Sequence, residues 1–335
     1  MRAVVVTPEP TLSIQEVADP PDDGRALVAV RRGGICGTDV KVATGLIPVY
    51  HPVILGHEIV GTVARAGSLD LFPLGQRVLM NSTKSCGYCD RCRANQTSLC
   101  RVSGAMGRDE DGGFADFVAL DERQLHPLPD GIPDDEAVLL QVTSTCVHAQ
   151  SLITPFPGDT AVIVGLGVSG LIHLQLLLVR GVQNVIGVTR SAWKRELAET
   201  LGARATATPE DAEALVEELT QGRGADLVIE AAGKTETMRQ SIEMAGAGGT
   251  ILGFGIQTEN TAEAPFYQWY LKELTIVNSR GSGGADYDRA IALAVSGQLQ
   301  LRPLLSRSYP FDEIAAAIDA CASDSNVLKV ELEIG

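Results

Sequence analysis

One short segment limits the possible folds of this chain more than any other, the run Gly165-Leu166-Gly167-Val168-Ser169-Gly170. It follows an apolar segment at 161–165 and opens a helical pattern. In such a turn the first glycine makes the tight bend, the second lets the backbone approach a pyrophosphate, and the third lets the helix pack on the strand. Free N–H groups at the helix N-terminus favour the negative phosphates. We therefore expect a dinucleotide site here.

The sequence around this segment alternates between strand and helix patterns. We expect strands at 161–165, 185–189, 226–230 and 250–253, with a weaker strand near 203–207. The helices between them are expected to end at Gly181, Gly202, Gly222 and Gly246, because glycine accepts the left-handed conformation just past a last helical turn. Strand–helix alternation with short links predicts an α/β domain, a Rossmann doubly wound parallel sheet.

The rest of the chain has a different pattern. Residues 1–140 contain short β-rich pieces at 2–7, 25–33, 59–64 and 114–120, separated by Pro, Asp and Gly clusters, which predicts an irregular β barrel or sandwich. The segment 155–159 marks the change, and from about Ala285 we expect one more helix and a few strands. A chain of 335 residues is long for one core, so two domains are expected.

Composition excludes some classes of partner. The net charge is −15, which argues against nucleic acid or an anionic membrane as partner. The N-terminus has no apolar stretch typical of a secretory signal, and the most apolar window, 171–179, is too short to span a bilayer. Four of the seven cysteines are bunched, which favours metal binding over disulfides in such a chain. We expect a cytoplasmic protein.

The bunched cysteines have the spacing of a metal site. Cys86, Cys89, Cys92 and Cys100 form C-x₂-C-x₂-C-x₇-C. Four thiolates close a tetrahedral zinc site and leave no position for substrate, so the zinc would be structural. An iron–sulfur cluster is the alternative, but the short ferredoxin spacing places its fourth cysteine three residues on and follows it with proline. Here Cys100 comes later and is followed by Arg101. Zinc is favoured.

A second set of possible ligands lies in the stretch from Gly34 to Glu58. Cys36, His57 and Glu58 offer sulfur, nitrogen and oxygen, the donors that Zn²⁺ accepts. By itself this pattern also fits a small buried cysteine and a hydrogen-bonded histidine.

The end of the second expected strand indicates which cofactor is used. An acidic residue there would bind the ribose hydroxyls of NAD and repel a 2′-phosphate. This chain has Thr189 and Arg190 instead, with Lys194 close behind. NADP(H) is therefore expected over NAD(H). The alternative is that Lys194 and its neighbour Arg195 simply form a solvated helix face.

Together these motifs resemble the medium-chain, zinc-dependent alcohol and polyol dehydrogenases, in order and spacing, over nearly the whole chain. The resemblance implies a GroES-like, β-rich catalytic domain at 1–145 and 280–335, whose structural-zinc lobe covers about 84–102. It implies a Rossmann domain at 146–279 that binds NAD(P), and a catalytic zinc between the two domains.

The resemblance also implies roles for single residues. Cys36 and His57 would be ligands of the catalytic zinc, and Glu58 would be an adjacent carboxylate able to ligate. Asp39 would orient His57. Thr38 would take the alcohol proton, and Thr145 would touch the nicotinamide ring.

Two positions depart from the pattern of that family. Gln141 occupies the position of a third ligand that is usually Cys, Glu or Asp, and Lys41 stands where a histidine often completes the proton relay. We expect Glu58 to ligate zinc directly or through water, with Gln141 nearby as a hydrogen-bonding or weak ligand. His51 is a possible substitute for the relay, although an exposed loop histidine is the simpler interpretation.

These observations predict an enzyme with two zinc ions per subunit. It would transfer hydride between a secondary alcohol or polyol, or the matching ketone, and NADP(H). Zinc would act as a Lewis acid on the substrate oxygen. One alternative is a reductase of activated C=C or C=N bonds on the same fold. Another is a non-catalytic NADP-binding protein, which would have no use for a proton relay beside a metal. Pairing through an edge strand at 275–279 would give a homodimer or homotetramer.

Overall fold

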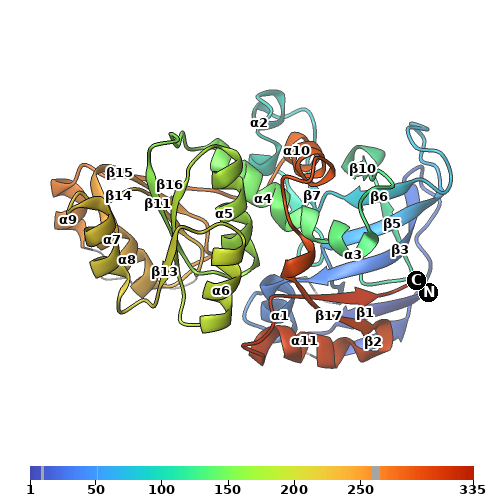
Figure 1. The fold of residues 1–335 in the computed structure, drawn as a ribbon. Helices are drawn as coiled ribbons and strands as arrows, with labels where there is room; N and C mark the ends of the chain where they lie inside the picture. The colour runs from blue at the N-terminus through green and yellow to red at the C-terminus, as the bar shows by residue number, and fades with distance from the viewer. Residues whose placement is uncertain (9–10, 51, 258–264) are drawn as a thin grey trace. The chain divides into compact units, whose positions relative to one another are not determined.

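The computed structural model describes residues 1–8, 11–50, 52–257 and 265–335. The chain divides into two compact units. The first unit contains Met1–Ser144, Gly281–Gly297 and Leu301–Gly335, and the second unit contains Thr145–Arg280 and Gln298–Gln300. The first unit is therefore built from both ends of the chain. The first unit is rich in β-strands, and the second unit contains a parallel sheet with helices (Figure 1).

The second unit is organised around a six-stranded parallel sheet with the order β13-β12-β11-β14-β15-β16. Its strands are β11 (Thr160–Val164), β12 (Asn184–Val188), β13 (Ala205–Ala207), β14 (Ala225–Glu230), β15 (Ala245–Gly253) and β16 (Thr275–Asn278). Every residue of β11 is buried, as expected for a strand covered by helices on both faces. The order reverses between β11 and β14, which is where doubly wound sheets bind ligands.

Helices flank this sheet on both sides (Figure 1). They are α5 (Val168–Val179), α6 (Ala192–Thr200), α7 (Ala212–Thr220), α8 (Thr235–Met244) and α9 (Phe266–Leu271). Gly181 and Gly202 follow α5 and α6 with positive φ, as predicted, and α7 ends just before Gly222. The prediction for Gly246 is wrong: α8 ends at Met244 and the chain enters β15 directly. An extended backbone therefore replaces a left-handed turn at that helix end.

The first unit consists mainly of antiparallel strands. Its main sheet has the path β10-β6-β5-β3-β18-β17, with β9 also paired to β3, and a smaller sheet has the order β2-β1-β4. The strands are β1 (Arg2–Val6), β2 (Leu12–Glu16), β3 (Ala26–Ile35), β4 (Val53–Ile54), β5 (Glu58–Arg65), β6 (Arg77–Met80), β9 (Phe117–Leu120), β10 (Leu125–Pro127), β17 (Leu305–Pro310) and β18 (Lys329–Glu333). One buried apolar cluster joins residues of both sheets and includes the fully buried Phe114.

Short helices complete the first unit. They are α1 (Gly37–Ala43), α2 (Asp90–Arg93), α3 (Asp134–Ala137), α10 (Gly284–Val295) and α11 (Ile314–Ser323), while α4 (Leu139–Ser151) begins in this unit and ends in the second. The sequence predicted one helix after Ala285, whereas the structure has two. The Ala-rich segment that forms α11 packs on β18 and α1, so tertiary contacts give it an apolar partner that the local pattern did not reveal.

A lobe extends from the first unit between two paired short strands, β7 (Thr83–Lys84) and β8 (Gly104–Ala105). It contains α2 (Figure 1), and the four clustered cysteines lie between its two strands in the sequence. Because little secondary structure lies between β7 and β8, the lobe depends on other contacts to hold its shape.

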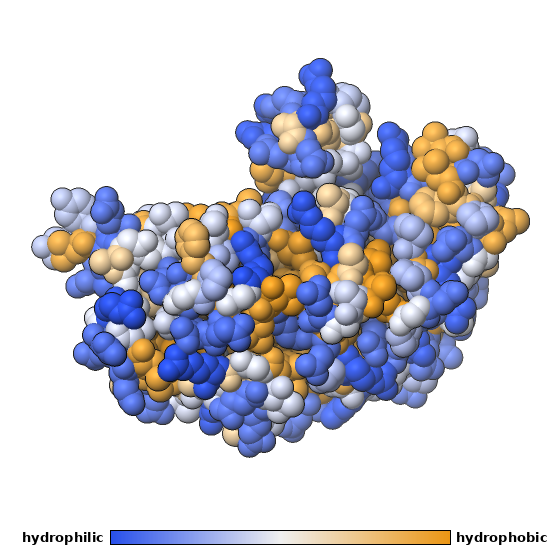
Figure 2. Space-filling model, turned by 45° about the horizontal axis from the view of Figure 1, so that its top comes forward, coloured by the Kyte–Doolittle hydropathy of each residue, from blue (hydrophilic) through white to orange (hydrophobic). Residues whose placement is uncertain are grey.

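The surface is mostly polar where it is seen. Hydrophilic side chains cover most of the face drawn in Figure 2, and apolar side chains appear there in smaller groups. Within the described residues, none of the helices combines the length and the apolar character needed to cross a bilayer.

Candidate metal and cofactor sites

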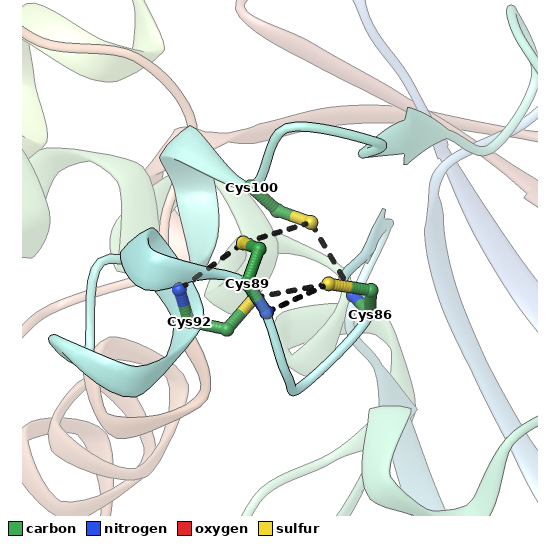
Figure 3. A group of neighbouring side chains, drawn as sticks. All are labelled: Cys86, Cys89, Cys92 and Cys100. Atoms are coloured by element: carbon green, nitrogen blue, oxygen red, sulfur yellow. Dashed lines mark hydrogen bonds between the residues drawn. The ribbon is translucent and has the colours of Figure 1, made fainter.

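The four cysteines of the lobe converge on one point. Their sulfur atoms lie within 4.8 Å of one another and face inward (Figure 3). The Sγ atoms of Cys86 and Cys92 are 3.9 Å apart, and those of Cys89 and Cys100 are 4.0 Å apart. Tetrahedral zinc with Zn–S bonds of about 2.3 Å requires sulfurs separated by about 3.8 Å. All four are free thiols, so the cluster fits a zinc ion.

The backbone of the lobe favours thiolates. The N–H of Cys92 donates to Cys89 Sγ, and the N–H of Cys86 donates to Cys100 Sγ. Backbone donors, first among them Arg101, lower the pKa of Cys89 to about 6. Burial raises the pKa of Cys92 to about 12, so that thiol needs a cation to ionise. Thiolate is the form that binds metal.

A second group of possible ligands comes from the start of α1 and the start of β5. The ligand atoms of Cys36, His57 and Glu58 lie within 4.8 Å of one another. Asp39 ties two of them together: its Oδ2 accepts a hydrogen bond from the Cys36 N–H at 2.8 Å, and its Oδ1 lies 3.2 Å from His57 Nδ1. With Nδ1 turned to Asp39, the other ring nitrogen is available to a metal, an arrangement common among metal-binding histidines.

The electrostatics of this group suit metal binding. Burial by itself raises the pKa of the Cys36 thiol, but the hydrogen bond and charge of His57 lower it below its usual value. Burial by itself lowers the pKa of His57, but the charge and hydrogen bond of Asp39 raise it well above its usual value. Both shifts favour the charged forms of the two groups, thiolate and imidazolium. Metal binding would use the thiolate and the neutral imidazole as ligands and would release any proton held by His57.

The position of Glu58 depends on a glycine and a lysine. Gly34 of β3 lies opposite Glu58 in the sheet, and a Cβ there would collide with the Glu58 carboxylate. Lys329 of β18 donates to both carboxylate oxygens, at 2.8 and 2.6 Å, and to the carbonyl oxygen of Ile35 at 3.2 Å. Only 1% of Glu58 and 4% of Lys329 are exposed, so this ion pair is shielded from water.

Thr38 and Gln141 lie in the first unit as well. Thr38 Oγ1 is 3.9 Å from Cys36 Sγ, at the start of α1. Gln141 is buried on α4 and donates from Nε2 to Ser82 Oγ at 3.2 Å. Lys41 is half-buried in the last turn of α1. His51 lies outside the described residues.

The second unit has a glycine-lined turn at the end of β11. Gly165 has φ +99°, and a Cβ there would press on the backbone of Ala232. A Cβ at Gly170 would collide with the carbonyl oxygen of Gly165, so α5 packs closely on the turn. Leu166 is buried, and Gly167 is the N-cap of α5, with Val168 and Ser169 in its first turn. The free N–H groups of this turn suit a pyrophosphate.

A cavity of about 680 Å³ begins at this turn. Its lining includes Gly165, Thr189, Arg190 and Lys234. Lys194 is not among the lining residues; its ammonium lies 5.2 Å from the ring centre of Trp193. Arg195 donates to the carbonyl oxygens of Thr189 and Arg190 and so fixes the backbone of the strand end. Thr145 is the first residue of the second unit, on α4.

Sequence reasoning missed Glu230, which forms hydrogen bonds with Ala232 and Thr237, two residues that line this cavity. Its carboxylate is fully buried at the end of β14. Oε1 accepts hydrogen bonds from the N–H groups of Ala232 and Gly233 and from Thr237 Oγ1. An acidic residue directly after the apolar run 227–229 was the available signal. Lys329 was missed as well, although it is the one cation in a segment, 327–334, in which apolar residues predominate.

Comparison with known families decides the relationship. Residues 22–130 match the model of the alcohol dehydrogenase GroES-like domain, and residues 168–296 match that of the zinc-binding dehydrogenases. Sorbitol dehydrogenase of Halalkalibacterium halodurans is 30% identical over 331 residues, which cover 96% of each chain. The chain belongs to the zinc-dependent medium-chain dehydrogenase family. It is thus an NAD(P)-dependent zinc dehydrogenase of the alcohol and polyol type.

Other similar proteins and solved structures support the same relationship. D-xylulose reductase A of Aspergillus oryzae is 31% identical, covering 87% of this chain and 84% of the relative. Among solved structures, a zinc-binding dehydrogenase from Sinorhizobium meliloti 1021, bound to NADP, has a TM-score of 0.91 at 33% identity, with 99% and 98% of the two chains covered. A structure from Escherichia coli CFT073, described as a short chain alcohol dehydrogenase with NADH, has a TM-score of 0.91 at 25% identity and covers 99% of both chains.

Proposed function

We propose that this family member interconverts a secondary alcohol or polyol and the matching ketone, with NADP(H) as its preferred cofactor. The observation that carries the proposal is the group formed by Cys36, His57 and Glu58, which offers three metal ligands in one place. The named relatives, a sorbitol dehydrogenase and D-xylulose reductases, point to polyols as the substrate class.

The residues of this group fit a catalytic zinc. Cys36, His57 and Glu58 would hold the ion, and Gln141 would lie close by as a hydrogen-bonding group or weak ligand. Three protein ligands leave a coordination position open, as catalytic zinc sites do. When bound, the zinc supplies Lewis acidity toward a substrate oxygen, and the nicotinamide exchanges the hydride.

The chain itself supplies orientation and proton transfer. Asp39 fixes the imidazole of His57 through Nδ1 and fixes the backbone of Cys36. Thr38 Oγ1, held at the start of α1 beside Cys36, would accept the proton of the substrate hydroxyl and pass it toward solvent. A hydroxyl both accepts and donates a hydrogen bond, so it can relay a proton without carrying charge. The four-cysteine lobe would hold a second, structural zinc.

The preference for NADP(H) is supported by the strand end after β12. Thr189 and Arg190 line the cavity, and the sequence has no acidic residue at 189–191, the position where an acid would bind the ribose of NAD and repel a 2′-phosphate. Arg190 would bind the phosphate, and Thr145 would contact the nicotinamide. Lys194 would contribute by its charge, although its stacking on Trp193 makes its share smaller.

The proposal includes the setting of the enzyme. Zinc–thiolate sites need reduced cysteines, so a reducing compartment such as the cytoplasm is proposed. Pairing of β16 with its copy in a second subunit would give a homodimer or a tetramer built from dimers.

The test is a panel of substrates with purified protein and each nicotinamide cofactor, followed by nicotinamide absorbance in the near ultraviolet. Turnover with polyols or secondary alcohols, lost after removal of the catalytic zinc, is the expected result. Turnover confined to enones or imines would favour the reductase on the same fold. Cofactor binding without any turnover would favour a non-catalytic NADP-binding protein.

A further inference from the structure

The ammonium of Lys329 has all of its hydrogen-bond donors in use. It has three N–H groups, and they are directed at Glu58 Oε1, Glu58 Oε2 and the carbonyl oxygen of Ile35. Both oxygens of Glu58 therefore already have a cationic partner before any metal is present. Glu58 would therefore use the same two oxygen atoms to ligate a metal and to pair with Lys329.

The surroundings make this competition strong. Glu58 and Lys329 are almost fully buried, and charges in a buried site interact more strongly than in water. A buried carboxylate that loses a hydrogen-bonded cationic partner is destabilising, because nothing replaces its hydration. In the metal-free protein Lys329 supplies that partner.

Zinc binding changes the balance of charges. Cys36 and Glu58 provide two negative charges, and Lys329 cancels one of them within the same cluster. The ion therefore meets a donor group of lower net negative charge, and it must share Glu58 with an ammonium. Both effects lower the affinity of the site for zinc, and removing the charge of Lys329 would abolish both.

We propose that Lys329 occupies Glu58 in the metal-free protein and competes with zinc for it, so that this lysine sets how tightly the catalytic zinc is held. The proposal rests on the proposed function only in taking Glu58 as a zinc ligand. Lys329 is a positioning residue: it acts on the metal through Glu58. A lysine that only supported the fold would stabilise metal-free and zinc-loaded protein equally.

The test compares wild type with Lys329→Met, which removes the charge and keeps an unbranched side chain. Zinc content per subunit and zinc release to a chromophoric chelator are measured for both. Melting temperatures are recorded with and without the catalytic zinc. We expect release of the catalytic zinc to slow by about tenfold or more, since each factor of ten corresponds to about 1.4 kcal/mol. We also expect the metal-free variant to have a lower melting temperature than metal-free wild type. In the zinc-loaded proteins this difference in melting temperature should be much smaller.

Two further variants keep the test decisive. Lys272→Met is the matched control, because Lys272 caps backbone carbonyls in the second unit and should leave zinc release unchanged. If Lys329→Met does not fold, Lys329→Met/Glu58→Gln, which leaves no unpaired carboxylate, is expected to fold. Failure of that double variant as well would overturn the proposal, because Lys329 would then act through other contacts.

The outcomes also separate this proposal from the proposed function. Two zinc ions per wild-type subunit with unchanged or faster release in Lys329→Met would overturn the role of Lys329 alone. A wild-type protein whose only zinc disappears in Cys89→Ser has no catalytic zinc, and that result would overturn both.

Discussion

Gln141 turns its amide nitrogen toward Ser82, with Nε2 donating to Ser82 Oγ at 3.2 Å in the buried interior of the first unit. This bond fixes the orientation of the amide and leaves its carbonyl oxygen as the group that can face a metal or a water. An amide oxygen is neutral, whereas Glu58 carries a charge. Because of this difference in charge, we propose Glu58, not Gln141, as the main oxygen ligand.

The first prediction follows from this difference. Glu58→Gln is expected to weaken retention of the catalytic zinc and to lower kcat by orders of magnitude, because the site loses a negative charge that offsets Zn²⁺. Gln141→Ala is expected to be milder. Zinc analysis after dialysis and steady-state kinetics check both variants. Equal losses in the two variants would show that Gln141 ligates as strongly as Glu58.

The second prediction concerns the four-cysteine lobe. Cys89→Ser should lose one zinc per subunit and lower the melting temperature or the soluble yield sharply, because structural zinc sites can contribute about 10 kcal/mol of apparent binding energy. Cys146→Ser, at a buried cysteine of the second unit, is the control and should keep both zinc ions. Unchanged zinc content and stability in Cys89→Ser would contradict a structural zinc.

The third prediction concerns cofactor choice. Wild type should prefer NADP(H) over NAD(H) by more than about tenfold in kcat/KM, which requires only about 1.4 kcal/mol. Thr189→Asp combined with Arg190→Ile should reverse the preference by adding an acid for the ribose and removing the phosphate partner. Lys194→Met should have a smaller effect, given its contact with Trp193. A wild-type preference for NAD would refute this assignment.

The fourth prediction concerns assembly. β16 is one of the two edge strands of the parallel sheet in the second unit, and an unpaired edge invites pairing with another chain. Light scattering at micromolar concentration should give a dimer or a tetramer. Thr275→Lys combined with Asn278→Lys should shift the protein toward monomer, because antiparallel pairing across a twofold axis would bring like charges together. A monomeric wild type would contradict the prediction.

The fifth prediction concerns acid stability. His173 is fully buried on α5, and burial lowers its pKa to about 3. In the unfolded chain the pKa of His173 is near 6.5, so this residue binds a proton there that it does not bind in the folded protein. The free energy of unfolding therefore falls as the pH drops below about 6.5. Between pH 7 and pH 5, His173 alone should lower the free energy of unfolding by about 2 kcal/mol. Denaturant unfolding of wild type and His173→Gln should show that the free energy of unfolding depends less on pH in the variant. The same pH dependence in both proteins would contradict this role of His173.

The glycine turn and the cysteine spacing were readable from the sequence because their requirements are local. Gly165 needs a positive φ and Gly170 needs room for a carbonyl oxygen, and both conditions arise within a few residues. The parallel sheet followed from strand–helix alternation. Gly246 was misjudged because an extended backbone and a turn both accept glycine, and the sheet decides between them.

Only the tertiary structure decided which charges meet. Lys329 and Glu58 are 271 residues apart in the chain, and they come together because β3 pairs with β5 on one side and with β18 on the other. A shift of one residue in either register would turn one side chain to the opposite face. The sequence by itself determined the ligands that could hold a zinc ion. The register of three strands determined that a buried lysine stands beside one of them, because side chains meet across a sheet only where hydrogen bonding aligns the strands.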